Sequence, residues 1–220
     1  MFNKKMKAVT FSYDDAPYHD RRLVELFNKY GLKCTFNINS GLFGAGHRQI
    51  LPDEMPSLYK GHEIAVHTVN HLHLENIEDD EKIVSEIEDD RRRLEDIMGY
   101  GIVGMAYPYG TYNDKVVELM ATRTAVKYSR TTRATRNFDV QTDLLRFHPT
   151  CHHNDERLFE LAQSFIEMKP DRPQIFYIWG HSYEFDRGEP GQWERMEEFC
   201  RLISGHNDIF YGTNAEILLG

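Results

Sequence analysis

Short runs of β-forming apolar residues alternate along this chain with longer stretches of helical periodicity, and this alternation restricts the fold more than any other feature. The pattern is typical of βα units built around a parallel sheet. Each run is short enough to be a strand that is buried on both faces. The sequence therefore predicts strands at residues 8–13, 34–38, 63–67, 102–107, 125–129, 174–179 and 209–211, with residues 144–148 as a weaker candidate.

The intervening stretches carry the spacing of amphipathic helices. Apolar residues at positions 23, 26, 27 and 30 follow the i, i+3, i+4, i+7 rule, and the pattern stops at Gly31, which suits a left-handed helix cap. Asp20 is placed to cap the start of this helix. The blocks Glu88-Asp89-Asp90 and Arg91-Arg92-Arg93 are expected to be solvated helix surface. Further helices are predicted at residues 79–98, 114–122, 155–168 and 192–203.

The length of the chain limits the number of these units. Domains commonly contain about 50 to 250 residues, so we expect the 220 residues to form one catalytic domain, 1–220. A complete eightfold barrel typically needs about 250 residues. We therefore predict an α/β fold, a distorted or incomplete (β/α) barrel of about seven parallel strands, with an open doubly wound sheet as the alternative. The loops at residues 40–47 and 130–141 are expected to be the most mobile segments.

Charge and apolar content exclude several classes of function. Lys plus Arg number 26 and Asp plus Glu number 35, so the formal charge of −9 repels a nucleic-acid backbone. No stretch approaches the roughly 20 apolar residues of a membrane helix, and no apolar signal core follows the charged start. We therefore expect a protein with no nucleic-acid partner and no membrane span, which is cytoplasmic as written and extracytoplasmic only if a leader was removed. Three widely spaced cysteines are expected to be reduced and structural: Cys34, Cys151 and Cys200.

Unusual polar residues stand at the carboxyl ends of the predicted strands. They are Asp14 and Asp15 at the first strand, His67 and His71 at the third, Tyr109 at the fourth and His181 at the penultimate strand. In α/β barrels and open sheets this edge binds ligands and carries out catalysis, whereas the other edge mainly serves stability. Residues that are far apart in the sequence are therefore predicted to converge on one site.

Three of these positions form a candidate metal site. His67 and His71 are four residues apart, so one helical turn or tight loop can direct both imidazoles at a common centre. One carboxylate from the aspartate pair would complete three protein ligands and leave positions open for water and substrate. Two histidines and a carboxylate also bind non-haem iron in oxygenases, which is an alternative for this set.

Each motif also has a purely structural interpretation. Two histidines at this spacing are more often surface or core residues than ligands, and an aspartate pair after a strand often caps a helix or begins a turn. Tyr107-Pro-Tyr-Gly110 fits a strand-ending turn, and His181 fits a hydrogen-bonded residue at a strand end. Adjacent carboxylates at a metal can instead divide the work, one binding the ion and the other accepting a proton. The functional interpretation depends on all these residues meeting at one edge.

Taken together, the motifs resemble those of the polysaccharide deacetylases of the NodB-homology type, carbohydrate esterase family four. The matching segments, in the family's order, are Phe11-Ser-Tyr-Asp14-Asp15-Ala-Pro17, His67-Thr-Val-Asn-His71, Ala106-Tyr-Pro-Tyr109-Gly110 and Ile178-Trp-Gly-His181. The resemblance spans nearly the whole chain. It implies a metal-dependent hydrolase that removes N- or O-linked acetyl groups from a carbohydrate or a related small substrate.

The resemblance also implies a role for each residue. Asp14 would be the general base, His181 the general acid, and the Tyr109 backbone N–H a donor to the oxyanion. The ligands of one divalent metal would be Asp15, His67 and His71. Zinc is the first candidate for this metal, with cobalt, manganese or nickel as alternatives. The aromatic residues near strand ends that are candidates for stacking on a sugar ring are Tyr13, Tyr109, Trp179 and Tyr183.

Three positions depart from the family pattern. Ala16 stands where a glycine usually follows the two aspartates, and Ala106 stands where an arginine holds the catalytic base. The family's fourth motif, an Asp and Trp pair, is missing between residues 129 and 151. The alternative function is therefore a catalytically weak, glycan- or metabolite-binding relative of the deacetylases. The basic residues that are candidates to replace the arginine are Arg130, Arg133, Arg136 and Arg146.

Overall fold

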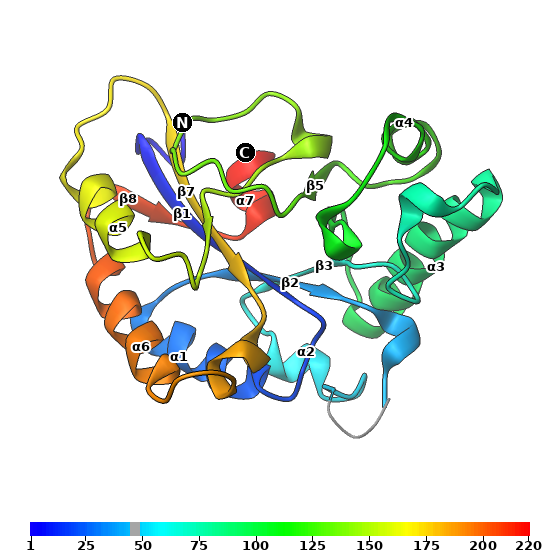
Figure 1. Cartoon of the computed structure of the whole chain (residues 1–220), viewed down its shortest axis with the longest axis horizontal. Coiled ribbons are helices and arrows are strands. Elements are labelled where there is room, and N and C mark those ends of the chain that lie inside the picture. The colour runs from blue at the N-terminus through cyan, green and yellow to red at the C-terminus, as the bar shows by residue number, and fades with distance from the viewer. Residues whose placement is uncertain (45–48) are drawn as a thin grey trace.

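Within residues 1–44 and 49–220, which the computed structural model describes, eight parallel strands form one curled sheet. The strands are β1 (Lys7–Asp14), β2 (Cys34–Ile38), β3 (Glu63–Val66), β4 (Gly104–Ala106), β5 (Tyr128–Arg130), β6 (Cys151–His152), β7 (Gln174–Gly180) and β8 (Ile209–Tyr211). Seven of them follow the order β5-β4-β3-β2-β1-β7-β6, and β8 pairs with β1. The sheet curls into an open half-barrel (Figure 1), so the prediction of a distorted (β/α) barrel is confirmed.

Helices cover the outside of this sheet. Figure 1 shows α1, α5 and α6 along its left and lower left side and α3 and α4 on its right. The helix α1 ends as predicted at Gly31, whose φ of 65° lies in the left-handed region. The α-helices of the described chain are α1 (Asp20–Tyr30), α2 (Met55–Leu58), α3 (Asp80–Met98), α4 (Asp114–Arg123), α5 (Leu158–Glu167), α6 (Gln192–Ile203) and α7 (Asn214–Leu218).

The strand β1 is the centre of the sheet, and all eight of its residues are buried. One edge of β1 pairs with β7 over residues 7–13. Its other edge is divided, since β8 pairs with residues 7–9 and β2 pairs with residues 11–14. Two strands therefore share one edge of β1, and the aspartate pair stands at the carboxyl end of this fully buried strand.

The segment predicted as a weaker strand at residues 144–148 joins the two ends of the strand order. Residues Leu144–Arg146 form a 3-10 turn, so the strand prediction is wrong for them. Phe147 alone forms a parallel bridge with Arg130 of β5, and the chain then reaches β6, which pairs with β7. A single bridged residue followed by a two-residue strand is too short to produce a recognisable pattern in the sequence.

The structure describes the first of the two loops expected to be mobile only in part and the second in full. Residues 45–47 of the first loop lie outside the described residues. The second begins at Arg130 and Thr131, which are fully buried, and the Thr131 N–H donates to the Phe147 carbonyl. The start of that loop therefore belongs to the core. The three cysteines are buried and free. No helix in the described part of the chain combines the length and apolar character needed to cross a membrane.

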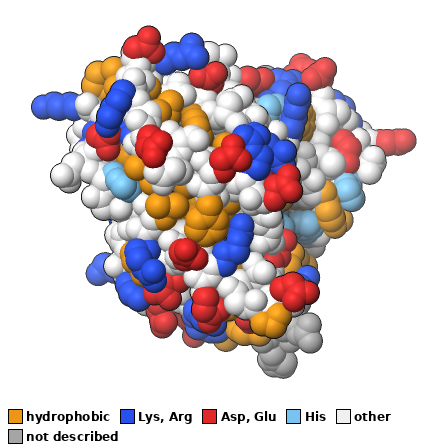
Figure 2. All heavy atoms as spheres, turned by 60° about the vertical axis from the view of Figure 1, so that its left-hand side comes forward, with side chains coloured by type: hydrophobic (Ala, Val, Ile, Leu, Met, Phe, Trp, Pro, Cys, Tyr) orange, Lys and Arg blue, Asp and Glu red, His pale blue; other side chains and the backbone are white. Residues whose placement is uncertain are grey.

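Charged side chains of both signs are interleaved on the surface. Figure 2 shows a face on which acidic and basic side chains alternate, with hydrophobic side chains between them. The expectation that charge blocks on α3 are solvated is wrong at two positions, because Glu88 and Asp90 are both buried. The Asp90 carboxylate accepts hydrogen bonds from the backbone N–H groups of Ser40 and His67, at 2.7 and 3.0 Å. A buried carboxylate needs such donors, and here they belong to loops that lead to the carboxyl edge.

A buried lysine lies at the end of β1 that is opposite the aspartate pair. Lys7, at the start of β1, has a side chain that is only 2% exposed and forms an ion pair with Asp208 at 3.0 Å. Its ammonium group also donates to carbonyl oxygens at the end of α5, those of Phe165, Ile166 and Met168. These are orphan acceptors of a helix terminus, which a cation satisfies well. Lys7 therefore ties α5 to the central strand.

We predict that Lys7→Met destabilises the protein by about 1–3 kcal/mol, because three carbonyl groups and a carboxylate lose their donor. Urea unfolding monitored by circular dichroism measures the change. Lys169→Met is the matched control, since Lys169 contacts the same Asp208 but is 82% exposed. The control should lie within about 0.5 kcal/mol of the wild type. Equal effects of the two substitutions would contradict the structural role of Lys7.

Candidate active site

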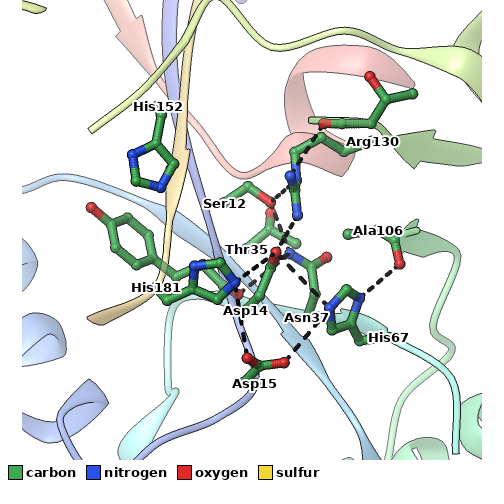
Figure 3. Close-up of polar contacts among 12 residues, drawn as sticks. Ser12, Asp14, Asp15, Thr35, Asn37, His67, Ala106, Arg130, His152 and His181 are labelled. Carbon is green, nitrogen blue, oxygen red and sulfur yellow. Dashed lines mark hydrogen bonds and ion pairs between the residues drawn. The ribbon is translucent and has the colours of Figure 1, made fainter. Parts of the chain in front are cut away.

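The residues that the sequence places at strand ends lie together at the carboxyl edge. Asp14 ends β1, His67 follows β3, Tyr109 follows β4 and His181 follows β7. Figure 3 shows that the side chains of Asp14, Asp15, His67 and His181 point toward one another. Segments separated by more than a hundred residues thus supply groups to one site.

The loops that carry these groups have unusual backbone geometry. Eight non-glycine residues with positive φ are recorded in the described chain, and five of them lie here: Asp15, Ala16, Thr68, His71 and Tyr109. Such conformations cost of order 1–3 kcal/mol each and persist only where surrounding contacts hold them. Ala16, at the position of the family's glycine, has a φ of 47°, so the turn keeps the shape that glycine favours.

Asp15, His67 and His71 form the candidate ligand set. Their ligand atoms all lie within 4.8 Å of one another. Asp15 Oδ1 is 3.7 Å from Nε2 of His67 and 3.7 Å from Nε2 of His71. His67 is almost completely buried, whereas Asp15 and His71 are partly exposed at 26% and 20%. The set is therefore compact and open to solvent on one side.

His67 is held in one orientation and one tautomer. Its Nδ1 lies 2.8 Å from the Ala106 carbonyl oxygen, which can only accept, so Nδ1 carries the proton. The Nε2 lone pair is thereby left facing Asp15. The side chain of Asn39 donates to the His67 carbonyl, and Asp90 accepts from its N–H. Supporting contacts of this kind are what orient a metal-binding histidine.

Asp14 is buried and held by two donors. Asn37 Nδ2 donates to Oδ1 at 2.8 Å, and the Arg130 guanidinium donates to Oδ2 at 2.5 Å. Burial raises the pKa of Asp14, but the positive charge of Arg130 and the nearby histidines outweigh it, so the pKa lies below its ordinary value. Asp14 Oδ2 is also 3.9 Å from Nε2 of His67 and from Nε2 of His181.

Arg130 occupies the role for which the sequence offered four candidates. It is fully buried, lies over the Trp179 ring at 4.6 Å, and also donates to Ser12. Two of the other candidates contact acidic residues elsewhere, Arg136 at Asp155 and Arg146 at Asp143 and Asp114. Of the two possibilities, that another basic residue reaches Asp14 or that neighbours alone hold it, the structure therefore shows the first.

His181 lies between the two aspartates and a third carboxylate, that of Glu184. Its Nε2 is 3.9 Å from Asp14 and Asp15, and its Nδ1 is 3.4 Å from Glu184 Oε1. Burial lowers the pKa of His181, but the three carboxylates outweigh it and raise the pKa above its ordinary value. Burial raises the pKa of Glu184, whereas its contacts with His152 and His181 hold it well below the usual range. Glu184 is thus an anion.

An open cavity of about 740 Å³ lies beside the ligand set. Asp15 and His71 line it together with three tyrosines, Tyr18, Tyr109 and Tyr183. Of the aromatic residues expected to contact sugar, Tyr13 is fully buried in the core and Trp179 packs on Arg130, so Tyr109 and Tyr183 alone face this cavity. A larger cavity of about 970 Å³ lies between the two chain ends and contains none of the site residues.

Three residues at the site were missed in the sequence. Asn37 is a polar residue in the buried strand β2, and that mismatch was a usable signal. Glu184 stands three residues after His181, and the two residues form a capping box at the start of one 3-10 turn. Asp90 stands in a run of charge that resembles ordinary helix surface. Asp90 had no local signal, because its role depends on segments brought together by folding, whereas the contact between Glu184 and His181 is local.

A curled parallel sheet with acidic and imidazole groups at its carboxyl edge defines a (β/α)-barrel protein with its site at the strand ends. The profile of one family, described as polysaccharide deacetylase, matches residues 2–127, which is more than half of the chain. No curated protein matches the sequence. The chain belongs to the polysaccharide deacetylase family.

Solved structures share the fold. The Streptococcus pyogenes deacetylase PplD in complex with acetate is 25% identical with a TM-score of 0.57, and the match covers 62% of this chain and 61% of that one. The family 4 carbohydrate esterase from Streptomyces lividans in complex with acetate is 16% identical with a TM-score of 0.59, covering 95% and 92%. The Bacillus anthracis pseudoenzyme BA3943 is 16% identical with a TM-score of 0.61, covering 99% and 66%. The chain therefore spans less than two thirds of the streptococcal protein.

Asp20 does not cap α1 as expected and instead contacts a residue next to the site. The N-cap residue is His19, and no side chain caps this helix. The Asp20 carboxyl is fully buried and accepts hydrogen bonds from Tyr59 at 2.8 Å and from Ser182, the neighbour of His181, at 2.5 Å. Burial raises the pKa of Asp20 to about 7. The capping prediction failed because tertiary partners compete for the same oxygens.

We predict that Asp20→Asn flattens the dependence of stability on pH. Because the folded-state pKa of about 7 exceeds the ordinary value of 3.8, the contribution of this carboxyl is complete below 3.8 and is lost as pH rises to about 7. Urea unfolding across that window should show the wild type losing stability relative to Asp20→Asn. The control Asp96→Asn, at an exposed position of α3, should keep the wild-type profile. Parallel profiles for all three proteins would contradict the prediction.

Proposed function

We propose that this chain is a metal-dependent deacetylase that removes N- or O-linked acetyl groups from a carbohydrate or a related small substrate. One observation carries the proposal: the set Asp15, His67 and His71 faces both Asp14 and His181 within a single site. Membership of the polysaccharide deacetylase family supports a carbohydrate substrate. The proposal thus includes the acetyl group that is removed, the sugar that carries it and the amide or ester bond that is cleaved.

The residues present fit a single divalent metal. Asp15, His67 and His71 would hold it, and the proton on His67 Nδ1 leaves Nε2 free to bind. Two imidazoles and one carboxylate leave positions open, as in catalytic zinc sites, so zinc is the first candidate and cobalt, manganese and nickel are alternatives. A metal bound there supplies Lewis acidity, which acidifies a water molecule and polarises the acyl carbonyl.

Protein groups would carry the proton transfers. Asp14, ionised beside Arg130, would accept the proton of the attacking water. His181, whose raised pKa favours the protonated form, would donate a proton to the leaving group. The Tyr109 backbone N–H would donate to the developing oxyanion, a contribution whose removal costs about a hundredfold or more in rate.

Two further residues would position the acid and the base. Arg130 fixes Asp14 from a second strand and keeps it ionised. Glu184 lies beside Nδ1 of His181, which directs Nε2 toward Asp14 and Asp15. Both are positioning residues, because neither faces the cavity beside the ligand set. Arg130 would hold Asp14 in place of the missing arginine, and Glu184 would hold His181 in place of the missing fourth motif.

The cavity supports a sugar-sized substrate. Its volume of about 740 Å³ is within the usual range for small-molecule sites, roughly 300–1,000 Å³. Tyr109 is 53% exposed and its ring stacks on His73, so its outer face is available to a sugar ring. Tyr183 lines another part of the same cavity. Aromatic faces beside a metal set suit a pyranose that presents its acetyl group to the site.

The alternative is a catalytically weak relative that binds a glycan or metabolite. The fold is shared with a protein described as a pseudoenzyme, so the fold does not decide activity. The presence of both Asp14 and His181 in the site favours the active enzyme. Release of acetate from acetylated sugars, together with turnover of an acetylated chromogenic ester, separates the two. Turnover of neither substrate by metal-loaded protein would favour the binding function.

We predict that His71→Ala releases the metal and leaves the fold intact, because His71 lies on a surface loop above the core. Metal content after dialysis, measured by elemental analysis, should fall to background, with an affinity loss of at least about a hundredfold. His73→Ala is the matched control, because His73 lies two residues away and is 46% exposed. The control should keep its metal. Iron instead of zinc in the purified wild-type protein would favour the oxygenase alternative. Global unfolding of His71→Ala would instead indicate a structural histidine.

We predict different outcomes for the two neighbouring aspartates. Asp14→Asn should retain metal and lose about 100-fold to 10,000-fold in kcat, because a general base is removed. Asp15→Asn should lose both metal and activity, since a ligand is weakened. Metal content and acetate release measured on the same preparations distinguish them. Loss of metal in Asp14→Asn alone would mean that the two aspartates have exchanged roles.

A further inference from the structure

A second group of metal-binding side chains adjoins the first. His152, His181 and Glu184 each offer a ligand atom, and these atoms lie within 4.8 Å of one another. His152 Nε2 is 3.1 Å from Glu184 Oε2, and His181 Nδ1 is 3.4 Å from Glu184 Oε1. Separations of this size are close to those between ligands of one tetrahedral ion at about 2.0–2.2 Å. Figure 3 shows His152 beside His181, on the side of the site away from His67.

We infer that His152, His181 and Glu184 form a second, weaker zinc site, and that zinc bound there inhibits the enzyme. The donor set of two imidazoles and a carboxylate suits zinc. The three side chains are 24%, 19% and 25% exposed, so an ion reaches them from solvent. Nδ1 of His181 is buried and lies 3.4 Å from Glu184 Oε1, which is itself a member of the set. An ion bound by both residues would replace this contact.

The contacts of His152 explain why this site is the weaker one. Its Nδ1 accepts a hydrogen bond from the Asn154 N–H at 3.1 Å, so in the neutral ring the proton is on Nε2, which faces Glu184. Zinc that binds Nε2 must displace this proton. The neutral ring then carries its proton on Nδ1 and loses the hydrogen bond from the Asn154 N–H. Nε2 of His153 also lies 3.2 Å from Glu184, but His153 is fully buried and contacts the Tyr13 hydroxyl. It stays outside the ligand set.

His181 belongs to both groups of ligands, which is the reason for inhibition. Its Nε2 faces Asp14 and Asp15, while its Nδ1 faces Glu184. With zinc on Nδ1, the only proton left on the ring is on Nε2, and its loss would produce an imidazolate. Such a group is far too weak an acid to protonate a leaving group near neutral pH. This consequence rests on the acid role proposed above, whereas zinc binding itself does not.

Zinc binding tests the site directly. The wild-type protein, titrated with zinc against a chromogenic chelator, should show a tight and a weaker class of site. Asp15→Ala should keep only the weaker class, and adding His152→Ala to that variant should reduce its affinity at least about tenfold. His73→Ala is the control and should leave the weaker class unchanged. Equal titrations of Asp15→Ala with and without His152→Ala would overturn the proposal, whether or not the protein is an active deacetylase.

Inhibition tests the consequence. With the tight site filled and no excess zinc, His152→Ala should turn over substrate within about twofold of wild type, because His152 has no part in the reaction. Excess zinc should inhibit the wild type, and the inhibition constant of His152→Ala should rise at least about tenfold. Inhibition of both proteins at the same zinc concentration would place the inhibitory ion elsewhere and overturn the proposal.

Discussion

The buried ion pair between Arg130 and Asp14 is the interaction on which the rest of the site depends. It joins the end of β5 to the end of β1, two strands separated by three others in the sheet. Removing one partner of such a pair leaves an unpaired buried charge, at a cost of about 3–5 kcal/mol. Trp179 and Ser12 also contact the guanidinium, so strands β1, β5 and β7 meet around one cation. Arg130 therefore both joins these strand ends and keeps Asp14 ionised.

Rigid support from outside the site allows its loops to keep strained conformations. Asp90 in α3 binds the backbone of Ser40 and His67 at once, and the Ala106 carbonyl fixes the His67 ring. Position 106 thus still serves the site through its backbone, although its side chain is only a methyl group. Second contacts of this kind would lower the cost of organising His67 as a metal ligand.

Similar folds in this family occur in proteins described as deacetylases and in one described as a pseudoenzyme. The backbone therefore does not distinguish active from inactive members, and individual side chains must do so. In this chain Arg130 and Glu184 reach Asp14 and His181 from positions outside the expected motifs. Under the two proposals, the position of Glu184 beside two histidines would allow one carboxylate to position the acid in one condition and to bind a cation in another.

The sequence by itself determined the parallel α/β architecture and the meeting of Asp14, His67 and His181 at one edge. Hydrophobic periodicity is local, and parallel strands bring their carboxyl ends to the same edge whatever the connecting helices are. Only the tertiary structure decided which of four arginines reaches Asp14, and that the carboxylate of Asp90 reaches the backbone of His67. The side chain of Arg130 lies 116 residues along the chain from its partner, and no periodic pattern encodes a contact at that separation. Such pairs are selected by burial, because a charge removed from water is stable only beside the opposite charge that the fold brings to it.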